Sequence, residues 1–174
     1  YIGMDNCPHQ TVIIGAEAEI QKAVNELNRR GLIHQILSIN RPYHTPLFEP
    51  YTQCLRELFA RWPVNPPTMP IYSCTIKAPY PVNSEDIRRL MVDHWMRPVE
   101  FRKTIEKIYE DGGRIFLEVG PRGNLTAFVD DILRGRSYIA IPTNVPHRHG
   151  TTQINHMVGI LAAHGVSMKL DHLY

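Results

Sequence analysis

The spacing of apolar residues predicts strands and a helix over the first 40 residues. The β-branched run Gln10–Ile14 ends at Gly15, which is typical of a strand. Gly31 is suited to end a helix. The apolar face of that helix repeats at Ile20, Ala23, Val24 and Leu27. Leu32–Ile39 alternates imperfectly and is predicted as a second strand, so these segments together predict one α/β unit.

The remaining chain continues as short strands and amphipathic helices separated by proline- and glycine-rich loops. The predicted helices lie at Tyr51–Trp62, after Ser84, between Pro98 and Gly112, at Leu125–Leu133 and at Thr151–His164. The predicted strands are Met69–Ile76, Ile115–Val119 and Tyr138–Ile141. Ile115–Val119 is apolar throughout, which favours burial on both faces. Cys54 falls on an apolar stripe and is predicted to be buried, and Ser84 is predicted to cap its helix.

Composition narrows the class of protein. The chain has 174 residues and a formal net charge of +2, which is no basis for binding nucleic acid or an anionic membrane. No apolar run approaches the roughly 20 residues that a membrane helix needs. The three cysteines are widely spaced and odd in number, which favours a reducing cytoplasm over a disulfide framework. The sequence therefore predicts a globular α/β protein of the cytoplasm.

For nucleophilic acyl chemistry the sequence offers a candidate base but no convincing nucleophile. None of the serines stands in a G-x-S-x-G frame, and no cysteine has a suitable flanking pattern. A candidate base is His44, on a loop bracketed by Pro42 and Pro46, where active-site residues often gather. A lone loop histidine is also commonly a plain surface residue, so both interpretations stay open on this evidence.

Two other motifs favour structural explanations. The loop Gly120–Asn124 joins a strand to a helix but matches no phosphate-binding pattern, and Pro121 removes one amide donor. A structural turn is the better interpretation. Histidines crowd the last 30 residues at positions 147, 149, 156, 164 and 172. Their spacing completes no tetrahedral metal site, so solvated side chains are favoured.

Four motifs in a fixed order change the interpretation of His44. They are HQTVIIG at residues 9–15, YHTPLFEP at 43–50, HWMRPVEF at 94–101 and FLEVGP at 116–121. In these motifs the chain resembles the acyltransferase domains of type I polyketide synthases and the related malonyl-CoA:acyl carrier protein transacylases. The segments NCPHQ at 6–10, RPYHTP at 41–46 and GPRGNL at 120–125 are most similar to iterative enediyne and polyunsaturated fatty acid synthases.

The resemblance implies a fold and a division of the chain. It implies a partial ferredoxin-like subdomain at residues 1–40 and the C-terminal part of an α/β-hydrolase-like acyltransferase core at 41–138. A linker that follows the acyltransferase would occupy residues 139–174. The family's G-H-S-x-G nucleophile lies upstream of every motif matched here. The chain is therefore expected to be the C-terminal half of the domain and to be inactive alone.

Roles are implied for four residues by their places in the motifs. His44 takes the place of the catalytic base. His94 falls where the family has an Asn or Gln whose main-chain carbonyl orients that base. Tyr43 and Arg41 occupy motif positions that track which acyl unit is accepted, and the bulk of Tyr43 favours malonyl over methylmalonyl.

The implied reaction transfers an extender acyl group, most simply malonyl, from CoA to the phosphopantetheine thiol of an acyl carrier protein through a serine acyl-enzyme. The chain itself is expected to bind no metal or redox cofactor. The implied partners are the acyl carrier protein, the N-terminal half of the same domain and a neighbouring ketosynthase. The alternative is an acyltransferase remnant that only docks or braces other domains of a megasynthase.

Overall fold

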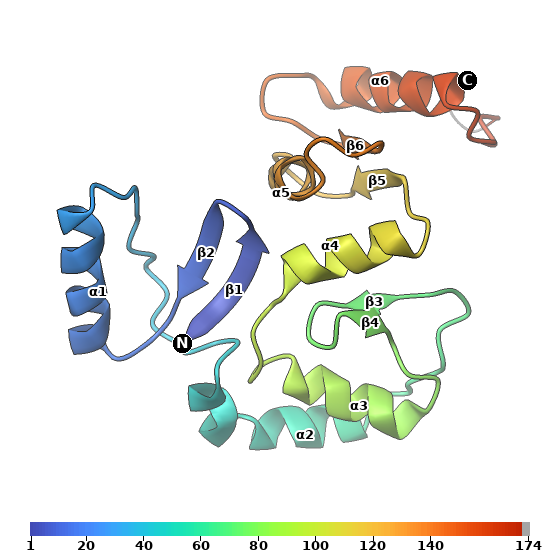
Figure 1. The fold of residues 1–174 in the computed structure, drawn as a ribbon. Coiled ribbons are helices and arrows are strands. Elements are labelled where there is room, and N and C mark those ends of the chain that lie inside the picture. The colour runs from blue at the N-terminus through green and yellow to red at the C-terminus, as the bar shows by residue number, and fades with distance from the viewer. Residues whose placement is uncertain (172–174) are drawn as a thin grey trace. The chain divides into compact units, whose positions relative to one another are not determined.

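A computed structural model describes residues 1–171, which divide into two units with a boundary between Ile108 and Tyr109 (Figure 1). The boundaries predicted at 40/41 and 138/139 differ from this one. They divide the chain by its resemblance to a family and not by its contacts, and they stay predictions. The last three residues of the predicted linker lie outside the described residues. Each unit is described by itself.

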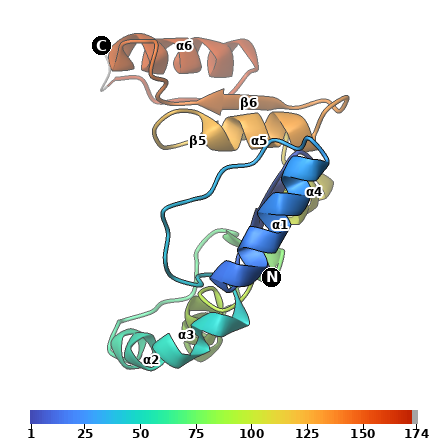
Figure 2. The same cartoon turned by 90° about the vertical axis from the view of Figure 1, so that its left-hand side faces the viewer.

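The first unit begins with an antiparallel hairpin of β1 (Ile2–Cys7) and β2 (Gln10–Ile13). Helix α1 (Glu17–Arg29) follows and lies beside the hairpin (Figures 1 and 2). The sequence predicted β2 and α1 but not β1, because Gly3 and the polar residues 5 and 6 interrupt its apolar pattern.

Strand β1 also contacts the segment that precedes helix α4 (Phe101–Glu110). The amide of Asp5 donates to the carbonyl of Val99, and the amide of Val99 donates to the carbonyl of Gly3, both at 2.9 Å. Arg102 adds an ion pair to the Asp5 carboxylate at 2.8 Å. These contacts bind residues near the start of the chain to residues about 95 positions later.

The strand predicted at Leu32–Ile39 does not form. The segment is irregular, with a bend at Ser38, and belongs to no sheet in the part of the chain that the structure describes. Its apolar side chains, Leu32, Ile33, Ile36, Leu37 and Ile39, are all exposed. A strand requires a neighbour to accept and donate its backbone hydrogen bonds, and residues 1–171 provide none here.

The centre of the first unit consists of short elements. They are the 3-10 helix η1 (Pro46–Tyr51), α2 (Gln53–Ala60), the antiparallel pair β3 (Tyr72–Ser73) and β4 (Ala78–Pro79), and α3 (Ser84–Asp93). Helices α2 and α3 pack side by side (Figures 1 and 2). The buried side chains of Phe59, Ile87 and Leu90 come from these two helices.

Two predictions about individual side chains were wrong. Cys54 is exposed, because α2 packs through Phe59 and the Cys54 thiol turns back to the carbonyl of Tyr51. The cap of α3 is Asn83, whose Oδ1 accepts hydrogen bonds from the amides of residues 85 and 86. Ser84 instead donates its hydroxyl proton to the carbonyl of Val64 at 2.8 Å, which fastens the proline-rich connector.

The second unit is built on a parallel pair, β5 (Ile115–Glu118) and β6 (Ile139–Pro142), joined through α5 (Asn124–Ile132). Helix α6 (Gly150–Ala163) adds its buried Gln153, whose amide donates to the carbonyl of Pro142 at 2.6 Å. The sequence predicted all four elements within a few residues. It was wrong about double burial of β5, since Ile115 and Leu117 are exposed.

A buried carboxylate secures the turn between β5 and α5. Glu118 is 9% exposed, and its Oε2 accepts hydrogen bonds from the amide and the hydroxyl of Thr126 at 2.7 and 2.8 Å. Thr126 is the third residue of α5, where a helix has an amide without an intrahelical acceptor. Glu118 therefore caps α5 from the preceding strand, while Gly123 at φ +83° completes the turn.

We predict that Glu118→Ala lowers the free energy of unfolding by about 1–2 kcal/mol, because it leaves that buried amide without an acceptor. Hydrogen exchange of the Thr126 amide measures the effect directly. Glu118→Gln is the matched control: it keeps an acceptor oxygen and should slow the exchange again. Equal exchange in the wild-type and alanine forms would contradict the capping role.

Candidate functional site

His44 lies on the loop between the irregular segment 32–39 and η1. The loop is held from inside by Thr45, which is fully buried and whose hydroxyl donates to the carbonyl of Pro42 at 2.7 Å. His44 itself has φ +61°, a left-handed conformation that costs an L-residue about 1–2 kcal/mol. Such strain persists only where surrounding contacts enforce it, and it is common at functional sites.

Those contacts come from the C-terminal end of α3. The backbone amide of His44 donates to the carbonyl of Trp95 at 2.8 Å, and Nδ1 of its ring lies 2.8 Å from the carbonyl oxygen of His94. Carbonyls at a helix end lack intrahelical donors and are free to accept bonds from elsewhere. Two successive carbonyls thus fix both the backbone and the ring of His44.

The bond to His94 also decides which ring nitrogen of His44 carries the proton. A carbonyl oxygen only accepts, so Nδ1 must be the donor. In the neutral ring the lone pair is then on Nε2, which has no hydrogen-bond partner within residues 1–171. An imidazole with a fixed ring and a free basic nitrogen is equipped to take a proton from a nucleophile.

Aromatic side chains support the loop on the other side. The ring of Tyr43 lies 5.1 Å from that of Phe48 and 5.8 Å from that of Trp95, measured between ring centroids. Phe48 is 7% exposed and also contacts Tyr51 at 5.4 Å. Tyr43, for which the family resemblance predicts a part in acyl selection, is therefore packed into an aromatic cluster directly beside His44.

The imidazole of His94 is close to His44 but is not equivalent to it. The two rings meet edge to face with centroids 4.9 Å apart, and Nδ1 of His94 lies 3.2 Å from the hydroxyl of Thr75. Burial, followed by the nearby His44, lowers the pKa of His94 below its ordinary value. The lowered pKa favours the neutral form of the His94 ring.

The structure brings together three of the four residues that the motifs singled out: His44, His94 and Tyr43. Arg41 is exposed at the start of the same loop. Sequence reasoning missed Thr75 and Trp95. Trp95 stood within a quoted motif and could have been found as an apolar anchor, whereas nothing in the sequence around Thr75 pointed to His94.

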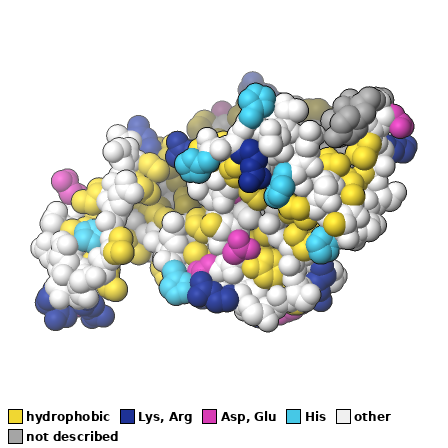
Figure 3. Space-filling model, turned by 90° about the horizontal axis from the view of Figure 1, so that it is seen from above, with side chains coloured by type: hydrophobic (Ala, Val, Ile, Leu, Met, Phe, Trp, Pro, Cys, Tyr) yellow, Lys and Arg dark blue, Asp and Glu magenta, His cyan; other side chains and the backbone are white. Residues whose placement is uncertain are grey.

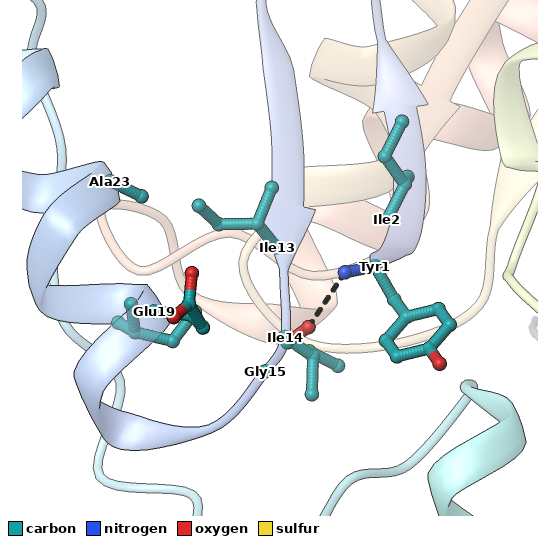
Figure 4. Close-up of a pocket in the computed structure, with 8 residues that line it drawn as sticks. Tyr1, Ile2, Ile13, Ile14, Gly15, Glu19 and Ala23 are labelled. Atoms are coloured by element: carbon teal, nitrogen blue, oxygen red, sulfur yellow. Dashed lines mark hydrogen bonds between the residues drawn. The ribbon is translucent and has the colours of Figure 1, made fainter.

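The other candidate features carry no comparable geometry. Within the described residues no three histidine, cysteine or acidic side chains could hold a metal ion, and Figure 3 shows histidines on the viewed face as separate groups. An apolar hollow of about 360 Å³ lies between the β1–β2 hairpin and α1 (Figure 4). It is lined by Ile2, Ile13 and Ile20 among others, and His44 is not part of its wall.

Comparison with known families shows where the chain belongs. The sequence matches the family described as "Acyl transferase domain" over residues 1–167. The chain belongs to this family. The match includes the His44 loop, the end of α3 and the turn after β5. In the described residues no helix is both long and apolar enough to cross a membrane.

Family relatives include free-standing enzymes and large synthases. The chain is 27% identical over 137 residues to the malonyl CoA-acyl carrier protein transacylase of Bacillus subtilis (strain 168), which covers 78% of this chain and 43% of that protein. It is 26% identical over 136 residues to a polyunsaturated fatty acid synthase polypeptide of Thraustochytrium sp., covering 77% of this chain and 5% of that protein. The chain thus spans less than half the length of the transacylase.

A solved structure shows the same fold. The acyltransferase domain from the second module of the salinomycin polyketide synthase superposes with a TM-score of 0.84 at 22% identity, over 98% of this chain and 40% of that one. These findings confirm the resemblance to acyltransferase domains and the predicted α/β fold class. The closer similarity to iterative synthases stays a prediction.

We predict that the stability of the first unit rises with pH because of His94. Unfolded His94 titrates near its ordinary pKa of 6.5, and folded His94 at a lower pH. Between these two values the unfolded chain binds more protons, so the free energy of unfolding increases with pH there and levels off above about 6.5. Denaturant unfolding followed by tryptophan fluorescence reports on this unit, because both tryptophans, Trp62 and Trp95, lie in it.

His94→Gln should flatten that slope. His34→Gln, at an exposed histidine of the same unit, controls for the loss of an imidazole as such. The same slope in the wild type and in His94→Gln would show that another group causes the pH dependence.

Proposed function

We propose that this chain supplies the general base of an acyltransferase, with His44 as that base and a serine outside these 174 residues as nucleophile. The observation that carries the proposal is the fixed ring of His44, whose Nδ1 bonds the carbonyl of His94 and whose Nε2 is free. The orienting role proposed for His94 is performed by its backbone, so a histidine serves there as well as an amide residue.

The proposed reaction proceeds in two symmetrical halves. The serine oxygen attacks the thioester carbonyl of malonyl-CoA while Nε2 of His44 takes the hydroxyl proton. The tetrahedral intermediate then collapses, the C–S bond breaks, and His44 returns the proton to the departing CoA thiolate. In the second half the phosphopantetheine thiol of an acyl carrier protein gives its proton to Nε2 of His44 and attacks the carbonyl of the acyl-serine. The C–O bond to serine then breaks, and His44 returns the proton to the serine oxygen.

Substrate and partners are proposed from the relatives. The Bacillus subtilis protein is named for malonyl-CoA and acyl carrier protein, and the Thraustochytrium protein for a polyunsaturated fatty acid synthase. We propose malonyl-CoA as acyl donor, a cytoplasmic location, and the N-terminal half of the domain and a ketosynthase as neighbours within a synthase. The 174 residues alone are proposed to be inactive, because a base without its nucleophile has nothing to activate.

Replacing His44 with alanine in the intact domain is predicted to lower serine acylation by malonyl-CoA at least about 100-fold, since proton transfer from the serine is lost. The rate at which radiolabelled malonyl-CoA labels the protein measures it. His156→Ala, at an exposed histidine on α6, is the control and should leave the rate unchanged. A loss below about tenfold in His44→Ala would reject His44 as base, and no acylation of the wild type would favour a docking remnant.

We further propose that Tyr43 sets the preference for malonyl. It precedes the base in sequence, and its ring is fixed against Phe48 and Trp95, so it cannot move aside readily for a methyl branch at C2. Arg41, exposed at the start of the loop, is proposed to add a donor near the entrance of the pocket. Discrimination of a single methyl group amounts to roughly 10- to 200-fold.

Tyr43→Ser in the intact domain should therefore shift the ratio of malonyl to methylmalonyl transfer toward methylmalonyl by about tenfold or more. Competition between the two CoA thioesters measures the ratio. Tyr51→Ser removes a ring from the same aromatic cluster and separates selectivity from general loosening of the loop. An unchanged ratio in Tyr43→Ser, or an equal shift in both variants, would remove Tyr43 from acyl selection.

A further inference from the structure

Thr75 makes a contact at the proposed site that the reaction does not itself require. It is 4% exposed, lies between β3 and β4, and its hydroxyl oxygen is 3.2 Å from Nδ1 of His94. The carbonyl of the same His94 accepts the bond from Nδ1 of His44. Two hydrogen bonds, one to the ring of His94 and one to its main-chain carbonyl, thus link Thr75 to His44 through the covalent frame of His94.

Thr75 is itself firmly held. Its amide donates to the hydroxyl oxygen of Ser73 at 3.1 Å. The turn around it is closed by the amide of Lys77, which donates to the carbonyl of Ser73 at 2.8 Å in a left-handed conformation at φ +54°. From the other side, the amide of Glu100 donates to the carbonyl of Cys74 at 3.0 Å. The backbone around Thr75 is thus fixed from two sides, so its side chain leaves from a defined position and can anchor a neighbour.

His94 needs an anchor because of its place in the fold. It is the residue that caps the C-terminus of α3, where helices fray and backbone carbonyls are less constrained than inside the helix. Its half-buried ring reaches away from the helix to the hydroxyl of Thr75. Fixing that ring limits rotation of the peptide plane whose oxygen faces His44.

We propose that Thr75 is a positioning residue for the base: its hydroxyl holds the His94 imidazole, and thereby keeps the His94 carbonyl aimed at Nδ1 of His44. The expected effect of Thr75 on the rate of acylation rests on the proposed function, in which His44 is the base. The expected effect on the tautomer and orientation of the His44 ring does not depend on which reaction follows.

The decisive comparison is between Thr75→Val and Thr75→Ser in the intact domain. Valine keeps the shape of threonine and removes the hydroxyl, whereas serine keeps the hydroxyl and removes a methyl group. Thr52→Val is the matched control, since Thr52 is equally buried and its hydroxyl donates to the carbonyl of Glu49 rather than to a histidine. Melting temperatures of the three variants show whether each remains folded.

Two measurements test the proposal: the tautomer of the His44 ring and the rate of acylation. Imidazole ¹⁵N shifts in histidine-labelled protein, with the His44 signal assigned by its loss in His44→Ala, report how far Nδ1 carries the proton. Thr75→Val should reduce the share of that tautomer and lower kcat of acylation about tenfold with KM unchanged. Thr75→Ser and Thr52→Val should stay within about twofold of the wild type in both measurements.

The proposal is overturned if Thr75→Val matches Thr52→Val in tautomer and kcat, or if Thr75→Ser loses as much as Thr75→Val, which would assign the effect to packing. Failure of the proposed function has a different signature. If His44→Ala acylates normally, His44 is not the base, while the ¹⁵N shifts still decide whether Thr75 positions its ring.

Discussion

The pair of hydrogen bonds between His44 and the end of α3 is the constraint on which the site depends. The backbone and the ring of one residue bond to the carbonyls of residues 94 and 95, both at 2.8 Å. His44 makes both bonds from a left-handed conformation, at φ +61°. The strain of that conformation is offset by the two bonds and by the buried Thr45 beneath them.

The surrounding elements can be understood as support for this contact. The aromatic rings of Tyr43, Phe48 and Trp95 pack the loop against the end of α3. On the opposite side the β3–β4 turn reaches the His94 ring through Thr75. The short strands of this region have little stability of their own, so their value lies in where they place these side chains.

Errors in the sequence-based predictions arose where a local pattern depended on distant partners. Leu32–Ile39 has the composition of a strand but finds no neighbouring strand within residues 1–171, and Leu117 of β5 is exposed although its pattern indicated burial. Strand β1 shows the converse: its sequence is broken by Gly3 and polar residues, yet backbone bonds to β2 and Val99 form it. Backbone pairing, which side-chain patterns do not encode directly, decided the cases of Leu32–Ile39 and β1. Strand β5 is paired with β6, and Leu117 is exposed because no other element within residues 1–171 buries its side chain.

The sequence by itself determined the family, the helical segments and the identity of His44 as the candidate base, because motif order and 3.6-residue periodicity are local properties of the chain. It also indicated that residues 41–46 form a rigid loop, since prolines restrict the backbone wherever they occur. Only the tertiary structure decided that Nδ1 of His44 meets the carbonyl of His94, 50 residues later, and that Thr75 contacts the His94 ring. Such contacts depend on how α3 and the β3–β4 turn pack against the loop, and packing between distant segments leaves no periodic trace in the sequence.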